Sequence, residues 1–211
     1  MIKKKVCIFV FVLAAAFAAA ALLFVGQYKN PEDVGKTIRI FDSTPILSIE
    51  TPQKINPKET DTVLLDVSIS DLGEEIYPAA SMSISFDSSR LEFLGVSEGN
   101  LFVHGDLNAA GIAQKLPEWS CNTQVSNDTG LINIMYLDMT GGKYGFDREL
   151  LSEDDNIVFR LGFRLRGSVR SGDILDIVIE DAVFAASDET KSLAVTAKTM
   201  DTKNGRIVIG E

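Results

Sequence analysis

The sequence predicts an all-β fold class, a β-sandwich or jelly roll, preceded by one N-terminal hydrophobic helix. From Ile46 onward, short runs of Val, Ile, Leu and Phe alternate with polar residues. Gly, Asn, Asp and Pro separate these runs, as turns between strands require. Before them, a basic N-terminus is followed by twenty-one residues without charge or proline, Val6–Gly26.

The N-terminal residues 1–26 predict export. Lys3, Lys4 and Lys5 precede the apolar run. A cleaved signal peptide has an apolar region of roughly 7–15 residues, whereas a spanning helix needs about 20. Length therefore favours a signal-anchor, although the alanines of Ala14–Ala21 offer peptidase sites and keep a cleaved signal peptide open. We expect an extracytoplasmic protein, anchored to the membrane by this helix or secreted if the helix is removed.

The rest of the chain divides into a linker and one domain. Residues 27–45 are mostly polar, contain Pro31 and Gly35, and predict a linker. Residues 46–211 predict the β-domain, with one helical turn at Asp147–Leu151. The strands that we expect in it are Ile46–Glu50, Thr62–Ser70, Ala79–Phe86, Leu91–Val96, Cys121–Val125, Leu131–Asp138, Ile157–Arg166, Ile174–Ile179, Leu193–Lys198 and Arg206–Ile209.

Alternation within two of these strands separates a core face from an outer face. Successive side chains of a strand point to opposite sides of its sheet. We therefore expect a core set of Met82, Ile84, Phe86, Ile132, Ile134 and Tyr136. The opposite face then holds Ser81, Ser83, Ser85, Asn133 and Met135. Such a flat, small-residue surface is usually a plain solvated sheet face.

Charge and cysteine content exclude several classes of protein. The chain has 20 Lys and Arg against 30 Asp and Glu, a net charge of -10. An acidic surface repels phosphate backbones, so we expect no nucleic-acid partner. Of two cysteines, Cys7 lies in the apolar run and Cys121 in the domain. The domain therefore cannot form an internal disulfide.

The residues for catalysis are sparse, so we expect no enzyme. The single histidine, His104, has no nucleophile motif around it. The carboxylates of Glu74–Glu75 and Glu153–Asp155 occur as adjacent residues, an arrangement more typical of a solvated turn than of an acid–base pair. Glu153–Asp155 offers oxygen ligands for calcium, but the EF-hand loop pattern is absent. We expect no metal and no cofactor in this chain.

A set of aromatic residues and a glycosylation sequon each allow a functional and a structural interpretation. Sugar-binding modules stack carbohydrate on exposed aromatic rings, and Trp119, Tyr136, Tyr144 and Phe146 supply aromatic rings. A carbohydrate-binding sandwich that grips polysaccharide directly is therefore the alternative function. Asn127–Thr129 matches a glycosylation sequon, which turn composition alone also explains.

The order of several motifs resembles the cohesin family. Ala79–Asp87 is a small-residue strand that ends in an aromatic residue and aspartate, and Leu-Glu and a glycine follow it, as in the cohesin signature. The remaining stretches that look like the family are Gly130–Asp138 with Gly141, Leu151–Asp155, Ile157–Phe163, Asp181–Ala185 and Gly205–Ile209. The family usually has Asp-Gly where Asp154 and Asp155 stand. The resemblance covers roughly Ile46 to Glu211.

The resemblance implies both a fold and a partner. Cohesins are nine-stranded jelly-roll sandwiches without enzymatic activity, and each binds a dockerin, a small module that carries the calcium, through one flat sheet face. Dockerin-bearing enzymes or scaffolds act in polysaccharide degradation at the cell surface. Carried over by position, the partner-binding residues are Ser81, Ser83, Asn122, Gln124, Asn133, Met135 and Asp138. Ala79 and Ser81 occupy places where the family often has polar or acidic contacts, which leaves the dockerin class open. A structural envelope protein of this fold without a dockerin partner also remains open.

Overall fold

The computed structural model describes residues 44–52, 54–70, 72, 75–108, 111–140, 142–146, 156–187 and 192–211. The expected N-terminal helix, nearly all of the linker and the expected helical turn at Asp147–Leu151 lie outside these residues. Within the described part of the chain, no helix is long and apolar enough to cross a bilayer.

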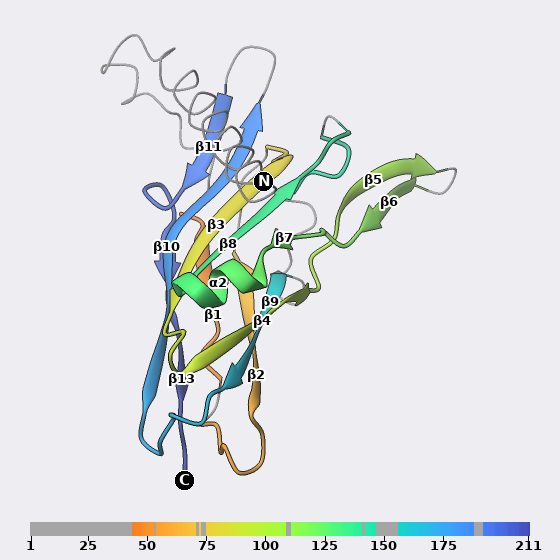
Figure 1. Cartoon of the computed structure of the whole chain (residues 1–211). Helices are drawn as coiled ribbons and strands as arrows, with labels where there is room; N and C mark the ends of the chain where they lie inside the picture. Colours follow the sequence, from red (N-terminus) through yellow and green to blue (C-terminus); the bar gives the residue numbers. More distant parts are fainter. Residues whose placement is uncertain are drawn as a thin grey trace, which may run out of the picture. The chain divides into compact units, whose positions relative to one another are not determined.

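Two β-sheets form the domain (Figure 1). The five-stranded sheet has the order β12 (Asp201–Lys203), β1 (Ile46–Ile49), β2 (Thr62–Ile69), β9 (Ile157–Leu165) and β4 (Leu91–Glu98). The six-stranded sheet has the order β11 (Ser192–Thr196), β10 (Ile174–Ser187), β3 (Ala79–Phe86), β8 (Leu131–Leu137) and β7 (Ser120–Cys121), and β13 (Gly205–Val208) also pairs with β10. Counted over the described residues, these two sheets hold eleven strands, not the nine that the resemblance implies.

A separate hairpin and one helix complete the described fold. The hairpin consists of β5 (Val103–Asn108) and β6 (Gly111–Lys115), and the sequence pattern predicts neither strand. It projects from the body of the domain in Figure 1. The helix α2 spans Thr123–Thr129. The prediction of a strand over Cys121–Val125 is therefore wrong beyond Cys121.

Local hydrogen bonding explains why α2 forms. The Asn122 side chain accepts a hydrogen bond from the Val125 N–H at 3.0 Å and caps the N-terminus of the helix. At the other end, Gly130 adopts a left-handed conformation with φ of 70° and donates its N–H to the Ser126 carbonyl at 2.8 Å. The single apolar residue between these caps, Val125, is half exposed, so no strand-like alternation competes with the helix.

Strand β10 is longer than the expected strand Ile174–Ile179. Its pairing with β3 shifts register between Ile179 and Asp181. This bulge accommodates the polar Glu180 and lets the strand continue to Ser187. Glu180 and Asp181 thus interrupt the apolar pattern of the sequence without ending the strand.

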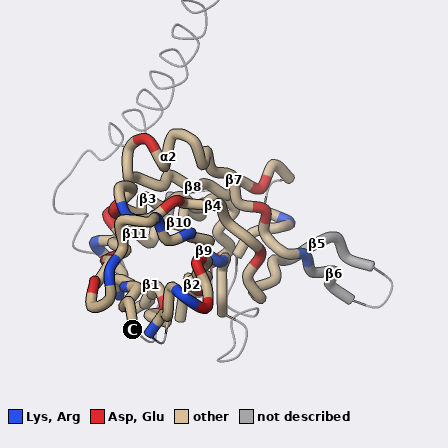
Figure 2. The backbone as a smooth tube through the Cα atoms, turned by 60° about the horizontal axis from the view of Figure 1, so that its bottom comes forward, with Lys and Arg blue, Asp and Glu red and all other residues tan. Residues whose placement is uncertain are grey.

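The core lies between the two sheets, which Figure 2 shows as two layers around one interior. All six side chains expected in the core are buried: Met82, Ile84, Phe86, Ile132, Ile134 and Tyr136. Aromatic rings join the layers. Phe86 of the six-stranded sheet lies 5.3 Å from Phe163 of the five-stranded sheet, measured between ring centroids. Tilted and edge-to-face contacts of this kind stabilise the core beyond the area that they bury.

Helix α2 connects the two sheets at one edge. The Asn127 side chain accepts from the Phe93 N–H at 2.7 Å and donates to the Phe93 carbonyl at 2.9 Å. Asn127 therefore occupies the free edge of β4 much as a neighbouring strand would. Its amide nitrogen also donates to the Thr123 carbonyl at 2.9 Å. The asparagine of the sequon thus has a structural role in this fold.

Candidate partner-binding face

The six-stranded sheet has one face on the core and one facing outward. We call the outward side chains of β10, β3, β8 and the edge strand β7 the open face; they are Ala79, Ser81, Ser83, Ser85, Ser120, Asn133, Met135, Leu137, Asp181 and Val183. All of these side chains are exposed or half-buried. The surface is made mainly of small and uncharged groups, because serine and alanine alternate with buried apolar residues along β3.

Met135 lies on the open face between β3 and the edge strand β7. Its register partners are Ser81 on β3 and Ser120 on β7. Both neighbours are short, so the long Met135 side chain rises above them, and 41% of it is exposed. One step along the strand, the Ser83 hydroxyl donates to the Asn133 amide oxygen at 2.7 Å. This hydrogen bond satisfies part of the hydrogen-bonding capacity of Ser83 and Asn133. Met135 is then the apolar side chain beside them that a partner could contact.

Two more exposed apolar side chains follow Met135 along the chain, one in β8 and one just beyond it. Leu137 is 54% exposed, and Met139, just beyond the end of β8, is 83% exposed. We call Met135, Leu137 and Met139 the β8 ridge. Residues two apart in a strand lie about 6.8 Å apart on one face, so Met135 and Leu137 are neighbours there, and Met139 follows in the turn beyond the strand. Exposed apolar groups gathered in this way are typical of interaction sites.

Asp138 lies in the turn after β8 and not on the open face. Its carboxylate accepts hydrogen bonds from the Thr140 N–H at 2.8 Å and hydroxyl at 2.6 Å, and from the N–H groups of Gly142 at 2.7 Å and Tyr144 at 3.1 Å. Burial raises the pKa of Asp138, but these hydrogen bonds outweigh burial and hold the pKa below its ordinary value. Asp138 therefore fixes the turn from which Met139 projects.

The structure brings together four of the seven expected binding residues: Ser81, Ser83, Asn133 and Met135. The other three lie elsewhere. Asn122 caps α2 and Gln124 lies within that helix, so neither is on a sheet face as expected. Leu137 was missed, although it shares the strand parity of Asn133 and Met135. Met139 was missed because it follows the end of the strand, where alternation no longer predicts direction.

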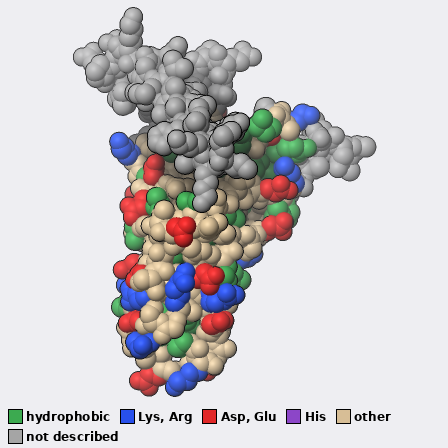
Figure 3. Space-filling model, in the orientation of Figure 1, with side chains coloured by type: hydrophobic (Ala, Val, Ile, Leu, Met, Phe, Trp, Pro, Cys, Tyr) green, Lys and Arg blue, Asp and Glu red, His purple; other side chains and the backbone are tan. Residues whose placement is uncertain are grey.

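One end of the open face is acidic. Asp181 of β10 lies opposite Ser83, and the Glu180 carboxylate accepts a hydrogen bond from the Ser85 hydroxyl at 2.6 Å. The ridge lies toward the other end, because β8 runs from Leu131, opposite Ser85, to Leu137, opposite Ala79. Elsewhere on the surface, Lys and Arg are interspersed with Asp and Glu, as Figure 3 shows for the lower half of its view.

Comparison with known families identifies the domain. The model of the cohesin domain matches residues 47–204. The chain belongs to the cohesin domain family. A search of curated proteins found no match.

Solved structures agree on the fold of this cohesin. The sixth cohesin of scaffoldin B from Acetivibrio cellulolyticus, in complex with a Cel5 dockerin, has a TM-score of 0.54 at 18% identity, over 79% of this chain and 99% of that one. A type I cohesin–dockerin complex from Clostridium thermocellum has a TM-score of 0.56 at 19% identity, over the same 79% and 99%. At this level of identity the likeness establishes the fold.

The aromatic side chains considered for sugar binding belong largely to the core of this cohesin. The Trp119 ring lies 4.9 Å from Phe159 and 5.8 Å from Phe146, and Tyr136 and Phe146 are buried. Burial also raises the pKa of Tyr136, whose hydroxyl donates to the Tyr144 carbonyl. The partly buried Tyr144 ring is covered by the Lys115 ammonium at 4.1 Å from its centroid. These rings do not form an exposed stacking platform.

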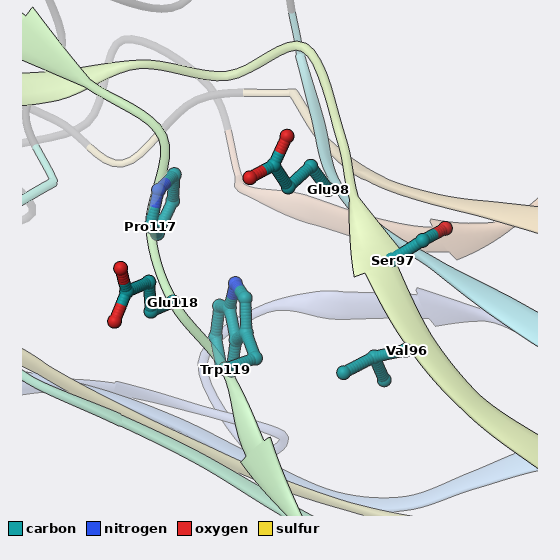
Figure 4. A pocket seen from close by; sticks show the side chains of 6 residues that line it. All are labelled: Val96, Ser97, Glu98, Pro117, Glu118 and Trp119. Atoms are coloured by element: carbon teal, nitrogen blue, oxygen red, sulfur yellow. The ribbon is translucent and has the colours of Figure 1, made fainter.

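A small pocket lies beside Trp119. Figure 4 shows Val96, Ser97 and Glu98 of β4 on one side, and Pro117–Trp119, which lead into β7, on the other. Its volume is about 190 Å³. The Trp119 indole N–H is buried and has no hydrogen-bond acceptor in the described structure. This volume is too small to hold an oligosaccharide.

The residues considered for catalysis or metal binding fall mainly outside the described side chains. These include the His104 side chain, Glu74 and Glu153–Asp155. Among the residues that the structure describes, no three His, Cys, Asp or Glu side chains lie together as metal ligands would.

Proposed function

We propose that this cohesin binds a dockerin through the open face of its six-stranded sheet. The observation that carries the proposal is the β8 ridge, in which Met135 rises between Ser81 and Ser120 and continues as Leu137 and Met139. Family membership supports it, as do the structural neighbours that hold dockerins. A sheet face is rigid before binding, so little conformational entropy is lost when a partner docks.

We further propose that the dockerin belongs to an enzyme or scaffold of polysaccharide degradation at the cell surface. The N-terminal run Val6–Gly26 supports export, with the domain held at the membrane or released. The neighbouring structures include one with a Cel5 dockerin and one with a ScaB dockerin, both from Acetivibrio cellulolyticus. In this proposal the cohesin is a non-catalytic adaptor that needs no cofactor of its own, and the calcium resides in the dockerin.

Isothermal titration calorimetry of the domain against a panel of dockerins tests the proposal. We expect calcium-dependent binding that Met135→Glu weakens about a hundredfold, because the complex would bury an unpaired carboxylate. Chelation of calcium should abolish binding through the loss of dockerin structure.

The matched control is Leu64→Glu. Leu64 is 58% exposed on β2, in the five-stranded sheet, so this variant adds the same charge to the other layer. It should bind like the unaltered protein. Equal loss in both variants would contradict the open face as the site. If no dockerin binds while cellulose or xylan does, the carbohydrate-binding alternative replaces the proposal.

A further inference from the structure

Exposure divides the methionines of the described chain into two classes. Met82 and Met200 are core residues, 2% and 5% exposed. Met135 and Met139 are 41% and 83% exposed, and both belong to the β8 ridge. The accessible thioethers in the described residues therefore coincide with the proposed partner-binding site.

The local structure leaves both methionine side chains exposed in the unbound protein. Met135 has only serines, Ser81 and Ser120, as its cross-strand neighbours, so neither one covers it. Met139 follows Asp138, whose carboxylate accepts four hydrogen bonds within the turn. That turn is held independently of Met139, which is free to project into solvent.

We infer that Met135 and Met139 are oxidative modification sites through which a peroxide switches off partner binding. This inference rests on the proposed function. Each thioether sulfur attacks one peroxide oxygen, the O–O bond breaks, and a sulfoxide and one water form from hydrogen peroxide. The sulfur loses two electrons and the peroxide gains them. A flexible apolar side chain thereby becomes a polar one.

Oxidation acts on binding because the sulfoxide must be buried in the complex. In the free protein both side chains face water, so the added oxygen is solvated and the fold is little affected. In the complex the same oxygen loses its water and faces a surface shaped for an apolar group. Leu137, between the two methionines in sequence, cannot be oxidised in this way. Its side chain therefore stays apolar after peroxide treatment.

The test combines peptide mapping with calorimetry. The cohesin alone is treated with hydrogen peroxide, the excess is removed with catalase, and oxygen gain is located by mass spectrometry. We expect Met135 and Met139 to be modified before Met82 and Met200. The dockerin affinity should then fall by about tenfold or more, as for a disrupted hot spot. Methionine sulfoxide reductases of both epimer specificities should restore it.

The matched control is the double variant Met135→Leu with Met139→Leu, which keeps the ridge apolar but cannot form sulfoxide there. Its own affinity for dockerin, whatever the starting value, should be the same before and after treatment. Equal loss in this variant, full affinity in the oxidised unaltered protein, or equally fast oxidation of Met82 would each overturn the inference. Absence of dockerin binding before any oxidation would overturn the proposed function, and this regulation with it, whatever the peptide map shows.

Discussion

At the scale of single residues, Asp138 shows how a polar group can hold the turn that carries a candidate binding residue, Met139. Its position at the end of β8 suggested a binding residue, but its carboxylate is saturated by its own turn. A carboxylate with several N–H and O–H donors favours its charged form. Asp138 therefore links the stability of the turn, and the placement of Met139, to pH.

The folded-state pKa of Asp138 is lowered from its ordinary value of 3.8, so the sign of the pH effect follows directly. The ionised group contributes stability above pH 3.8, and this contribution is lost as the pH falls through the folded-state pKa. We expect Asp138→Asn to lower the free energy of unfolding at pH 7 by about 1–2 kcal/mol. The variant should also lose less stability than the unaltered protein on acidification below pH 3.8.

Urea unfolding at a series of pH values measures both effects. Asp128→Asn is the control, since Asp128 is an exposed residue of α2. It should stay within about 0.5 kcal/mol of the unaltered protein. Parallel stability–pH curves for the Asp138 variant and the unaltered protein would contradict this role of the carboxylate.

At the scale of elements, the edge helix α2 depends on its C-terminal glycine. Gly130 has a φ of 70°, and a Cβ there would lie 2.9 Å from the Phe86 carbonyl oxygen. Its own carbonyl accepts the Phe86 N–H at 2.9 Å. Gly130 therefore joins the end of α2 to the end of β3, where no side chain fits.

Gly130→Ala should lower the free energy of unfolding by about 2 kcal/mol, from left-handed strain together with the close contact. Denaturant titration followed by circular dichroism measures it. Gly167→Ala is the control, because a Cβ at Gly167 meets nothing within 4 Å. A small, equal change in both variants would show that the α2–β3 junction tolerates a side chain.

The elements also show what sequence patterns can predict. Strands with clean alternation, such as Ala79–Phe86, were predicted with their correct bounds and faces. Cys121–Val125 was assigned to a strand because the Asn122 cap is a side-chain to backbone bond that apolar periodicity does not report. The hairpin β5–β6 was missed since Leu101–Leu116 has weak alternation. The bulge at Glu180 concealed the full length of β10 because its register shift depends on β3.

The residues of the candidate site also divide into those that sequence patterns predict and those that only the structure places. Ser81, Ser83, Asn133 and Met135 were found together because strand parity and family resemblance point to the same face. Met139 required the geometry of the turn beyond the strand. Asp181 joins the open face only through the pairing of β10 with β3 across nearly a hundred residues of sequence. Tertiary pairing of this kind is absent from local patterns.

At the scale of the whole molecule, the two sheets leave two outer faces that differ in chemistry. The open face of the six-stranded sheet is mainly small and uncharged around the β8 ridge. On the five-stranded sheet, Arg160 pairs with Asp66 at 2.8 Å and Arg164 with Glu92 at 3.3 Å. These partly exposed ion pairs flank Leu64 and stabilise the surface only modestly. The difference between the faces is the reason to assign the partner to one of them.

Methyl NMR of the dockerin complex tests that assignment most directly. With labelled methionine and leucine methyl groups, the methyl signals of Met135, Leu137 and Met139 should shift on addition of a calcium-loaded dockerin. Those of Leu64 and Leu94, which are exposed on the other sheet, should stay in place. Shifts confined to Leu64 and Leu94, with the ridge methyl groups unchanged, would contradict the open face as the dockerin-binding surface.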